Sequence, residues 1–249
     1  MKIKSPLFPI FLVLISLLLK SFSGPLFSSI SFFEDEYLNK HLIKTGVNVI
    51  LSICYLSFIF NSKISNQLRL FGDSKFKFQL ITFPLFYAAI VNLVFFEFEG
   101  DLKLKYLIAL LFSTLSVGLV EELSIRGIIQ NQLIEFYGEH RKGIIKSIVL
   151  SSFLFALMHL INFDKGVWGE IAQLFYSLFI GLAFGVVLFI TKRIYPLIII
   201  HGLIDFAAGL DRLGVVNNVQ NTSSWENSLF VILLLFPYLI YGLLLFKTH

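Results

Sequence analysis

The sequence predicts an all-α integral membrane protein, a polytopic bundle of about eight transmembrane helices. Two observations lead to this prediction: the composition is more apolar than a soluble domain tolerates, and apolar runs recur along the whole chain. Hydrophobic residues make up 57% of the 249 residues and charged residues 14%, with a mean hydropathy of +0.83, whereas soluble domains carry roughly a quarter charged residues. Because a transmembrane helix needs about 20 mostly apolar residues, the length allows one bundle and no separate soluble domain.

The apolar runs place the predicted helices along the chain. Short polar stretches separate them, and there is no internal repeat or long linker. The first run follows a basic start and precedes small residues, as a signal peptide does, but seven further runs favour a retained first helix. The expected spans are 6–22, 43–60, 77–96, 105–123, 144–163, 169–190, 195–210 and 228–246.

The basic residues between the runs predict the orientation. With a cytoplasmic N-terminus, twelve of them lie on the cytoplasmic side and five on the opposite side, which is the asymmetry that orients membrane proteins. Both termini are therefore expected in the cytoplasm, and the net charge of +4 requires no nucleic-acid partner. The cytoplasmic set is Lys2, Lys4, Lys63, Arg69, Lys75, Lys77, Arg141, Lys142, Lys146, Lys192, Arg193 and Lys247; the opposite set is Lys40, Lys103, Lys105, Lys165 and Arg212.

Ionisable side chains inside or at the ends of apolar runs are the candidates for function, since a charge held in hydrocarbon costs at least a few kcal/mol. Residues four apart share a helix face, so we expect Glu122 to form an ion pair with Arg126 and His201 to converge with Asp205. Glu121 is turned about 100° from Glu122 around the helix axis and can therefore face a cavity. The candidates are Glu121, Glu122 and Arg126 at the fourth run, His159 in the fifth, and His201 and Asp205 in the seventh.

This set of residues suits the activation of water at a peptide bond. Glu121 is a candidate general base, and a neutral His159 can share the proton of the water. His201 with a hydrogen-bonding neighbour can stabilise the oxyanion. Alternatively, an N2O2 site for one divalent metal ion, zinc, would carry the nucleophilic water. Its candidate ligands are His159, His201, Glu121 and Asp205, and the sequence leaves both uses open.

Two other chemistries are excluded or disfavoured. Cys54 is the only cysteine, so the chain has no internal disulfide and no cysteine-based zinc site. No Gly-x-Ser-x-Gly turn appears, which disfavours a serine nucleophile.

Residues 127–137 continue the fourth run with an amphipathic pattern. We expect them to extend the fourth helix and to emerge along the cytoplasmic interface. The extension matters because, in a simple antiparallel bundle, Glu121 would lie near the cytoplasmic face and His159 roughly 20 Å deep, at 1.5 Å per residue. A longer fourth helix would bring the two side chains together.

Three motifs together resemble the CAAX-protease and bacteriocin-processing family of intramembrane peptidases, which includes the eukaryotic CAAX-processing protease. They are Glu-Glu-x-x-x-Arg at 121–126, Phe-x-x-x-His at 155–159 and His-x-x-x-Asp at 201–205. The resemblance covers about 105–210, the four-helix catalytic core of the family. Residues 1–104 would then supply N-terminal membrane helices, and 211–249 a loop and a C-terminal helix.

The resemblance implies an intramembrane endopeptidase. Such an enzyme would hydrolyse a peptide bond in a membrane-associated or lipidated peptide or protein, through water activated by Glu and His or bound to a metal. The family often has Asn where this chain has Asp205, and an ionised Asp cannot donate to an oxyanion. By the resemblance, Glu121 and His159 would activate the water, His201 and Asp205 would bind the oxyanion or a metal, and Glu122 and Arg126 would shape the site.

Two other classes of function compete with a peptidase. One is a non-catalytic membrane protein that binds or shields a peptide, such as an immunity protein, but binding does not need both Glu121 and His159. The other is a small proton-coupled transporter, which is disfavoured because no inverted repeat appears. The Phe-, Ile- and Lys-rich composition favours a bacterial cytoplasmic membrane, where peptide or bacteriocin processing would be the role.

Overall fold

A computed structural model of the chain describes residues 7–22, 30–62, 78–161, 165–216 and 223–248. Most residues in these ranges lie in helices and none forms a β-strand, which confirms the predicted all-α membrane bundle. Part of the charge count that predicted the orientation lies outside the described residues, namely Lys2, Lys4, Lys63, Arg69, Lys75 and Lys77.

The helices follow the predicted order along the chain. In the described residues, five helical stretches are long and apolar enough to cross a membrane: 36–60, 104–137, 141–161, 166–191 and 225–248. The elements are α1 (Leu7–Ser21), α3 (Glu36–Phe60), α4 (Phe78–Thr82), η2 (Phe83–Phe86), α5 (Tyr87–Val94), α6 (Leu104–Glu122), η3 (Leu123–Gln130), α7 (Asn131–Tyr137), α8 (Arg141–Met158), η4 (His159–Ile161), α9 (Gly166–Thr191), α10 (Tyr195–Gly209), η5 (Leu210–Arg212), α11 (Trp225–Leu235) and α12 (Pro237–Thr248).

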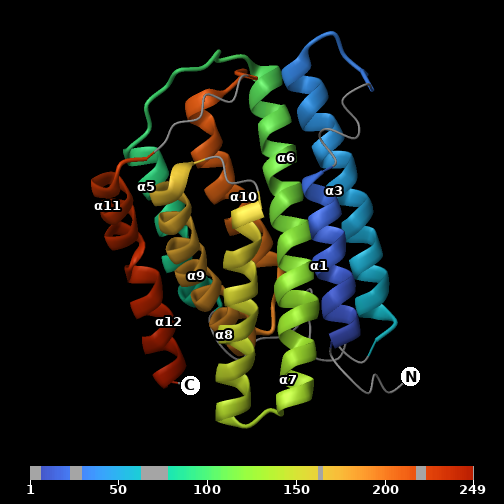
Figure 1. Ribbon diagram of the computed structural model, residues 1–249, viewed down its shortest axis with the longest axis vertical. Coiled ribbons are helices and arrows are strands. Elements are labelled where there is room, and N and C mark those ends of the chain that lie inside the picture. The colour runs from blue at the N-terminus through green and yellow to red at the C-terminus, as the bar shows by residue number, and fades with distance from the viewer. Residues whose placement is uncertain (1–6, 23–29, 63–77, 162–164, 217–222, 249) are drawn as a thin grey trace.

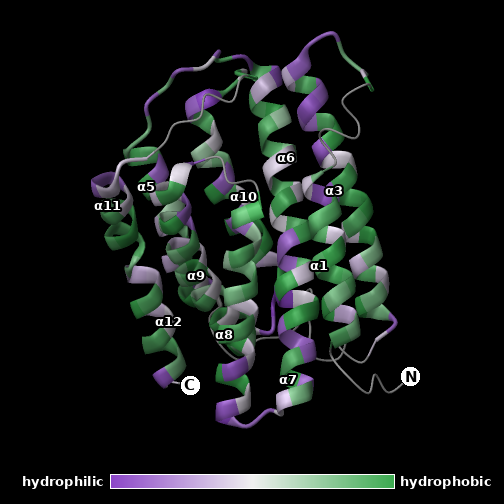
Figure 2. Ribbon diagram, viewed as in Figure 1, coloured by the Kyte–Doolittle hydropathy of each residue, from purple (hydrophilic) through white to green (hydrophobic). Residues whose placement is uncertain are grey.

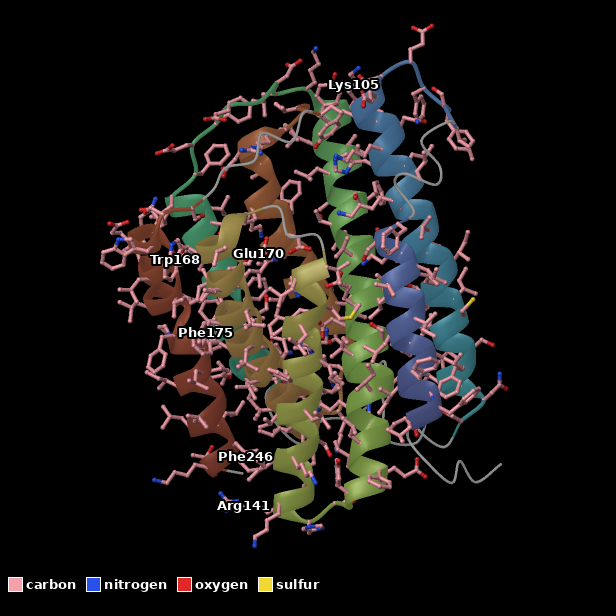
Figure 3. All side chains as sticks on the ribbon, in the orientation of Figure 1. Lys105, Arg141, Trp168, Glu170, Phe175 and Phe246 are labelled. Carbon is pink, nitrogen blue, oxygen red and sulfur yellow. The ribbon has the colours of Figure 1, made fainter. Side chains whose placement is uncertain are left out.

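The helices run along one long axis, and α1 begins at the end of the bundle where α12 finishes (Figure 1). Hydrophobic residues dominate the middle of the bundle and hydrophilic residues gather at its two ends (Figure 2). Lys105 and Arg141, which the charge count assigned to opposite sides, lie at opposite ends (Figure 3). This arrangement is the one expected for an even number of spans. Which end faces the cytoplasm stays a prediction. The division of the chain into 1–104, 105–210 and 211–249 also stays a prediction.

The fourth helix is extended as expected, but it does not emerge along an interface. Residues 104–137 form one continuous helix, and every residue from Glu122 to Ile134 is buried. Its second half packs against α1, α3, α8 and α9. The amphipathic pattern was a wrong indicator of an interfacial helix because polar side chains bond inside the bundle. Gln130 Nε2, for example, donates to the carbonyl oxygen of Gly185 at 3.0 Å.

The middle of this long helix, η3, is wound as a π-helix directly after the two glutamates. Wider turns of this kind are common at functional sites. They leave backbone carbonyls without their usual helical donors, and Asn131 Nδ2 supplies a replacement. It donates to the carbonyl oxygens of Arg126 at 2.8 Å and Gly127 at 3.1 Å. Asn131 therefore stabilises the unusual winding that follows the acidic pair.

Asp35 joins the outer ends of α3 and α6. Its carboxylate accepts from Lys105 Nζ at 2.6 Å and from Tyr106 Oη at 2.8 Å, and it caps α3 by accepting from the amide of Leu38. The hydrogen bond from Lys105 is the main cause that lowers the pKa of Asp35 to about 2. Asp35 is therefore ionised at neutral pH and fixes the register between these two helices.

Helices α6 and α10 touch backbone to backbone. A Cβ on Gly118 would lie 2.5 Å from the carbonyl oxygen of Ile198 and 2.9 Å from the amide nitrogen of Gly202. A Cβ on Gly202 would lie 2.9 Å from the Cα of Leu115. This close approach brings the side chains one turn further along α6 directly against α10.

Replacing Gly118 by Ala is predicted to force these two helices apart. Overpacking of this kind costs about 1–3 kcal/mol, so the midpoint of thermal unfolding in detergent should fall by several degrees. Gly46→Ala is the matched control, because Gly46 lies in α3 with no atom within 4 Å of an added Cβ. Ala is favoured over Gly in a helix by about 0.5–1 kcal/mol, so the control should keep or raise the midpoint. Equal midpoints for the two variants would contradict the backbone contact.

Candidate active site

The sequence-predicted side chains come from three helical elements that meet inside the bundle. Glu121 and Glu122 end α6, His159 follows the last turn of α8, and His201 and Asp205 lie on α10. Figure 1 shows that α8 ends part of the way along the α6–α7 helix rather than at the far end of the bundle. The extended fourth helix thus places its acidic pair beside the end of α8, as expected.

Glu122 is the buried centre of this cluster. Its side chain is 0% exposed, and its Oε1 accepts from Arg126 Nη1 at 3.2 Å, which confirms the predicted ion pair. The same oxygen accepts from His201 Nδ1 at 2.7 Å, a contact that the sequence did not suggest. The Arg126 guanidinium also lies 4.3 Å from the centre of the Phe155 ring, in a cation–π contact. Glu122 therefore links α6 to α10 as well as neutralising the arginine.

The hydrogen bond to Glu122 fixes the orientation of the His201 ring. An ionised carboxylate only accepts, so Nδ1 carries a proton, and Nε2 faces the other two carboxylates. Nε2 lies 3.7 Å from Glu121 Oε2 and 3.8 Å from Asp205 Oδ2. The predicted convergence of His201 with Asp205 is confirmed. Both distances exceed a direct hydrogen bond and suit a bridging water.

His159 is held by the backbone of its own helix. Its Nδ1 donates to the carbonyl oxygen of Phe155 at 2.9 Å, since a carbonyl only accepts. In the neutral imidazole this leaves Nε2 as an acceptor. The Phe155 ring lies 4.7 Å from the His159 ring and 5.9 Å from the His201 ring, between centroids. His159 is also close enough to interact electrostatically with Glu121, His201 and Asp205.

Glu121 has a partner that the sequence analysis missed. Its Oε1 accepts from Lys20 Nζ on α1 at 2.9 Å, and the two side chains are 20% and 15% exposed. Lys44 on α3 is exposed and interacts electrostatically with Glu121 and Asp205. Of 20 basic residues, the loop count used 17; the remaining three are Lys20, Lys44 and Arg126. The rule applied to the acids, that a charge within an apolar run indicates function, would have found both lysines.

Exposure changes across the site. The Glu122 carboxylate is fully buried, Glu121 is 20% exposed, and Asp205 is 36% exposed. The cluster therefore opens toward Glu121 and Asp205, while the ion pair behind it is sealed. A ligand that enters from this open side meets these two carboxylates first.

The described side chains bear on the metal site that the sequence left open. No group of three His, Cys, Asp or Glu residues in the described ranges is arranged to hold a metal ion. Glu121 Oε1 is engaged by Lys20 and His201 Nδ1 by Glu122, whereas Glu121 Oε2 and His201 Nε2 make no direct hydrogen bond within the part of the chain that the structure describes and face each other at 3.7 Å. A zinc site therefore stays a prediction, and the chemical steps below are written for water and the side chains alone.

Comparison with known proteins gives one match. Residues 103–207 match the family model described as type II CAAX prenyl endopeptidase Rce1-like. The match confirms the resemblance drawn from the three motifs over about 105–210. Comparison with curated proteins and with solved structures found no match.

The matched segment runs from the start of α6 into α10 and contains all six predicted site residues. The protein is thus a helical membrane protein with a core segment that is similar to a family of peptidases. Over this segment, which is less than half of the chain, it is similar to the Rce1-like family of CAAX endopeptidases. Helix α1, which carries Lys20, lies outside the match.

Breaking the Glu122–Arg126 pair is predicted to destabilise the bundle. Arg126→Met leaves an uncompensated buried carboxylate, which costs about 3–5 kcal/mol, so the midpoint of thermal unfolding in detergent should fall sharply. The double variant Glu122→Gln/Arg126→Met removes both charges and should recover much of the loss, because Gln still accepts from His201. A double variant no more stable than Arg126→Met would contradict the charge-pair account.

Proposed function

We propose that the protein is an intramembrane endopeptidase in which Glu121 and His159 activate one water molecule. The observation that carries the proposal is the arrangement around Glu121. Its Oε2 faces His201 Nε2 at 3.7 Å, a separation suited to a bridging water. His159, with Nδ1 engaged by a carbonyl, has Nε2 available to accept a proton.

The proposed reaction uses these groups in one addition and one elimination. The Glu121 carboxylate, assisted by His159, takes a proton from water as the water oxygen attacks the carbonyl carbon of the scissile bond. The carbonyl oxygen becomes an oxyanion. With both ring nitrogens protonated, His201 donates Nδ1–H to Glu122 and Nε2–H to that oxyanion. The oxyanion then re-forms the C=O bond as the C–N bond breaks, and the proton held by Glu121 passes to the leaving amine. The other product is a carboxylic acid, which loses its proton to bulk water and becomes a carboxylate.

Asp205 has a supporting role in this scheme. It lies 3.8 Å from His201 Nε2 on the open side of the site. An ionised carboxylate cannot donate to an oxyanion, so Asp205 would act through the charge and orientation of His201. Asn, which is usual in the family at this position, would donate directly instead.

The proposed substrates are membrane-associated or lipidated peptides. The site opens within a bundle whose outer surface is apolar, so a substrate that partitions into the bilayer reaches it directly. The matching family is described by its action on prenylated CAAX proteins, which makes a prenylated C-terminal peptide the first probe. Maturation of a bacterial peptide, including bacteriocin processing, is a second form of the same reaction.

The test is peptide cleavage by the purified protein in liposomes. A farnesylated CAAX peptide and its unmodified counterpart are incubated with wild type, and products are identified by mass spectrometry. Removing a general base lowers rates by about 10²–10⁴-fold, so Glu121→Gln should lose cleavage to that extent. Glu226→Gln, an exposed residue at the start of α11, is the matched control and should cleave normally.

Three results of this assay would contradict the proposal. Binding of the peptide by wild type without cleavage would favour a non-catalytic docking protein. Substrate-dependent proton flux without cleavage would favour a transporter. Cleavage at the wild-type rate by Glu121→Gln would remove the assigned base.

The metal requirement is tested on the same preparation. Because the described side chains do not group three ligands, we expect far less than one zinc ion per chain and cleavage that survives a chelator. Elemental analysis of wild type beside His159→Ala and His201→Ala measures this. Stoichiometric zinc that disappears in the two His variants would contradict the metal-free scheme and make the protein a metallopeptidase.

A further inference from the structure

We propose that Lys20, on a helix outside the family-matched segment, is a positioning residue that holds Glu121 in the orientation needed to activate water. The proposal rests on the proposed function and adds a residue to it. Lys20 Nζ donates to Glu121 Oε1 at 2.9 Å, which leaves Oε2 facing His201 Nε2. One oxygen of the carboxylate is thus anchored while the other remains free for the water.

The apolar face of α1 delivers Lys20 to this place. Ile10, Val13 and Leu17 are buried in the main core of the bundle, together with Val120 of α6. Their spacing of three and four residues continues to Lys20, so the lysine lies on the same face of the helix. The ammonium reaches the site because α1 packs against the long fourth helix, as its contacts with η3 show.

Contacts with α3 support the position of α1. The Ser16 hydroxyl and the Tyr55 hydroxyl form a hydrogen bond of 2.5 Å, and Ser16 Oγ also donates to the carbonyl oxygen of Val13. Tyr55 is itself buried in the core. The end of α1 is therefore fixed by both packing and hydrogen bonding, so Lys20 is held in place rather than lying free at a helix end.

The other charged groups near Glu121 do not provide the same anchor. His201 contacts Oε2 at 3.7 Å, beyond a direct hydrogen bond. His159, Lys44 and Arg126 interact with Glu121 electrostatically. Among the contacts that the Glu121 carboxylate makes within the described residues, the hydrogen bond from Lys20 alone fixes its rotation. Losing it would let the flexible Glu121 side chain turn away from the water.

An inhibitory role for Lys20 would require a different contact. A lysine that blocked catalysis would occupy the oxygen that faces His201, yet Lys20 binds the opposite oxygen. The lysine side chain is 15% exposed and that of Glu121 20% exposed, so the pair lies at the inner edge of the opening without sealing it.

The experiment compares Lys20→Met, Lys20→Arg and Lys20→Gln in the liposome cleavage assay. A misplacement of about 1 Å can cost about 10²-fold in rate, so Lys20→Met should lower kcat by about 10–100-fold and leave KM within about twofold. Arg retains a charged donor and should recover most of kcat. Gln retains a neutral donor and should fall between Met and Arg.

Lys103→Met is the matched control. Lys103 pairs with Asp101 at 2.5 Å on the exposed surface, so losing this charge should leave kcat and KM unchanged. Thermal unfolding of every variant is measured in the same detergent. If Lys20 had a purely structural role, its substitutions would lower the unfolding midpoint, but kcat would not decrease in the order Arg, Gln, Met.

Several outcomes would overturn the proposal. These are a wild-type or higher kcat in Lys20→Met, or equally low kcat in the Met and Arg variants. If Lys20→Met does not fold, the comparison of Arg with Gln decides, and equal kcat in those two would overturn it. Failure here is distinguishable from failure of the proposed function: in the first case Glu121→Gln still abolishes cleavage, and in the second wild type does not cleave.

Discussion

The structure depends on burying one carboxylate that is held through a single oxygen by two partners. Glu122 is 0% exposed and is bound by the Arg126 guanidinium and by His201 Nδ1. A charge without such partners would be strongly unfavourable in the interior. The hydrogen bond from His201 Nδ1 to Glu122 Oε1 also turns Nε2 of His201 toward Glu121 and Asp205. Stability and the geometry of the site therefore come from one interaction between α6 and α10.

Two features of the backbone make that interaction possible. The glycines of the α6–α10 contact let the helices approach until their backbones touch. The continuation of α6 through η3 and α7 moves the acidic pair away from a helix end and into the bundle. Together these two features bring the acidic pair of the fourth helix to the same depth in the bundle as the imidazole after α8. Neither helix needs a strong tilt for this.

Much of the fold and part of the site followed from the sequence. Apolar length predicted the helical class and the order of the helices, and four-residue spacing predicted the Glu122–Arg126 and His201–Asp205 pairs. Pairing between distant helices has no such local signal, so the bonds of Glu122 to His201 and of Lys20 to Glu121 were missed. The amphipathic pattern of 127–137 led to the wrong prediction of an interfacial helix. Such a pattern shows where polar side chains lie but not whether water or protein groups form their hydrogen bonds.

The central claim is that Glu121 and His159 act on the same water molecule. The most direct test measures single-turnover cleavage by Glu121→Gln, His159→Asn and the double variant. Residues that act as a unit are strongly non-additive, so the double variant should cleave about as slowly as the slower single variant. Losses that multiply in the double variant would show that the two residues act independently and would contradict the account.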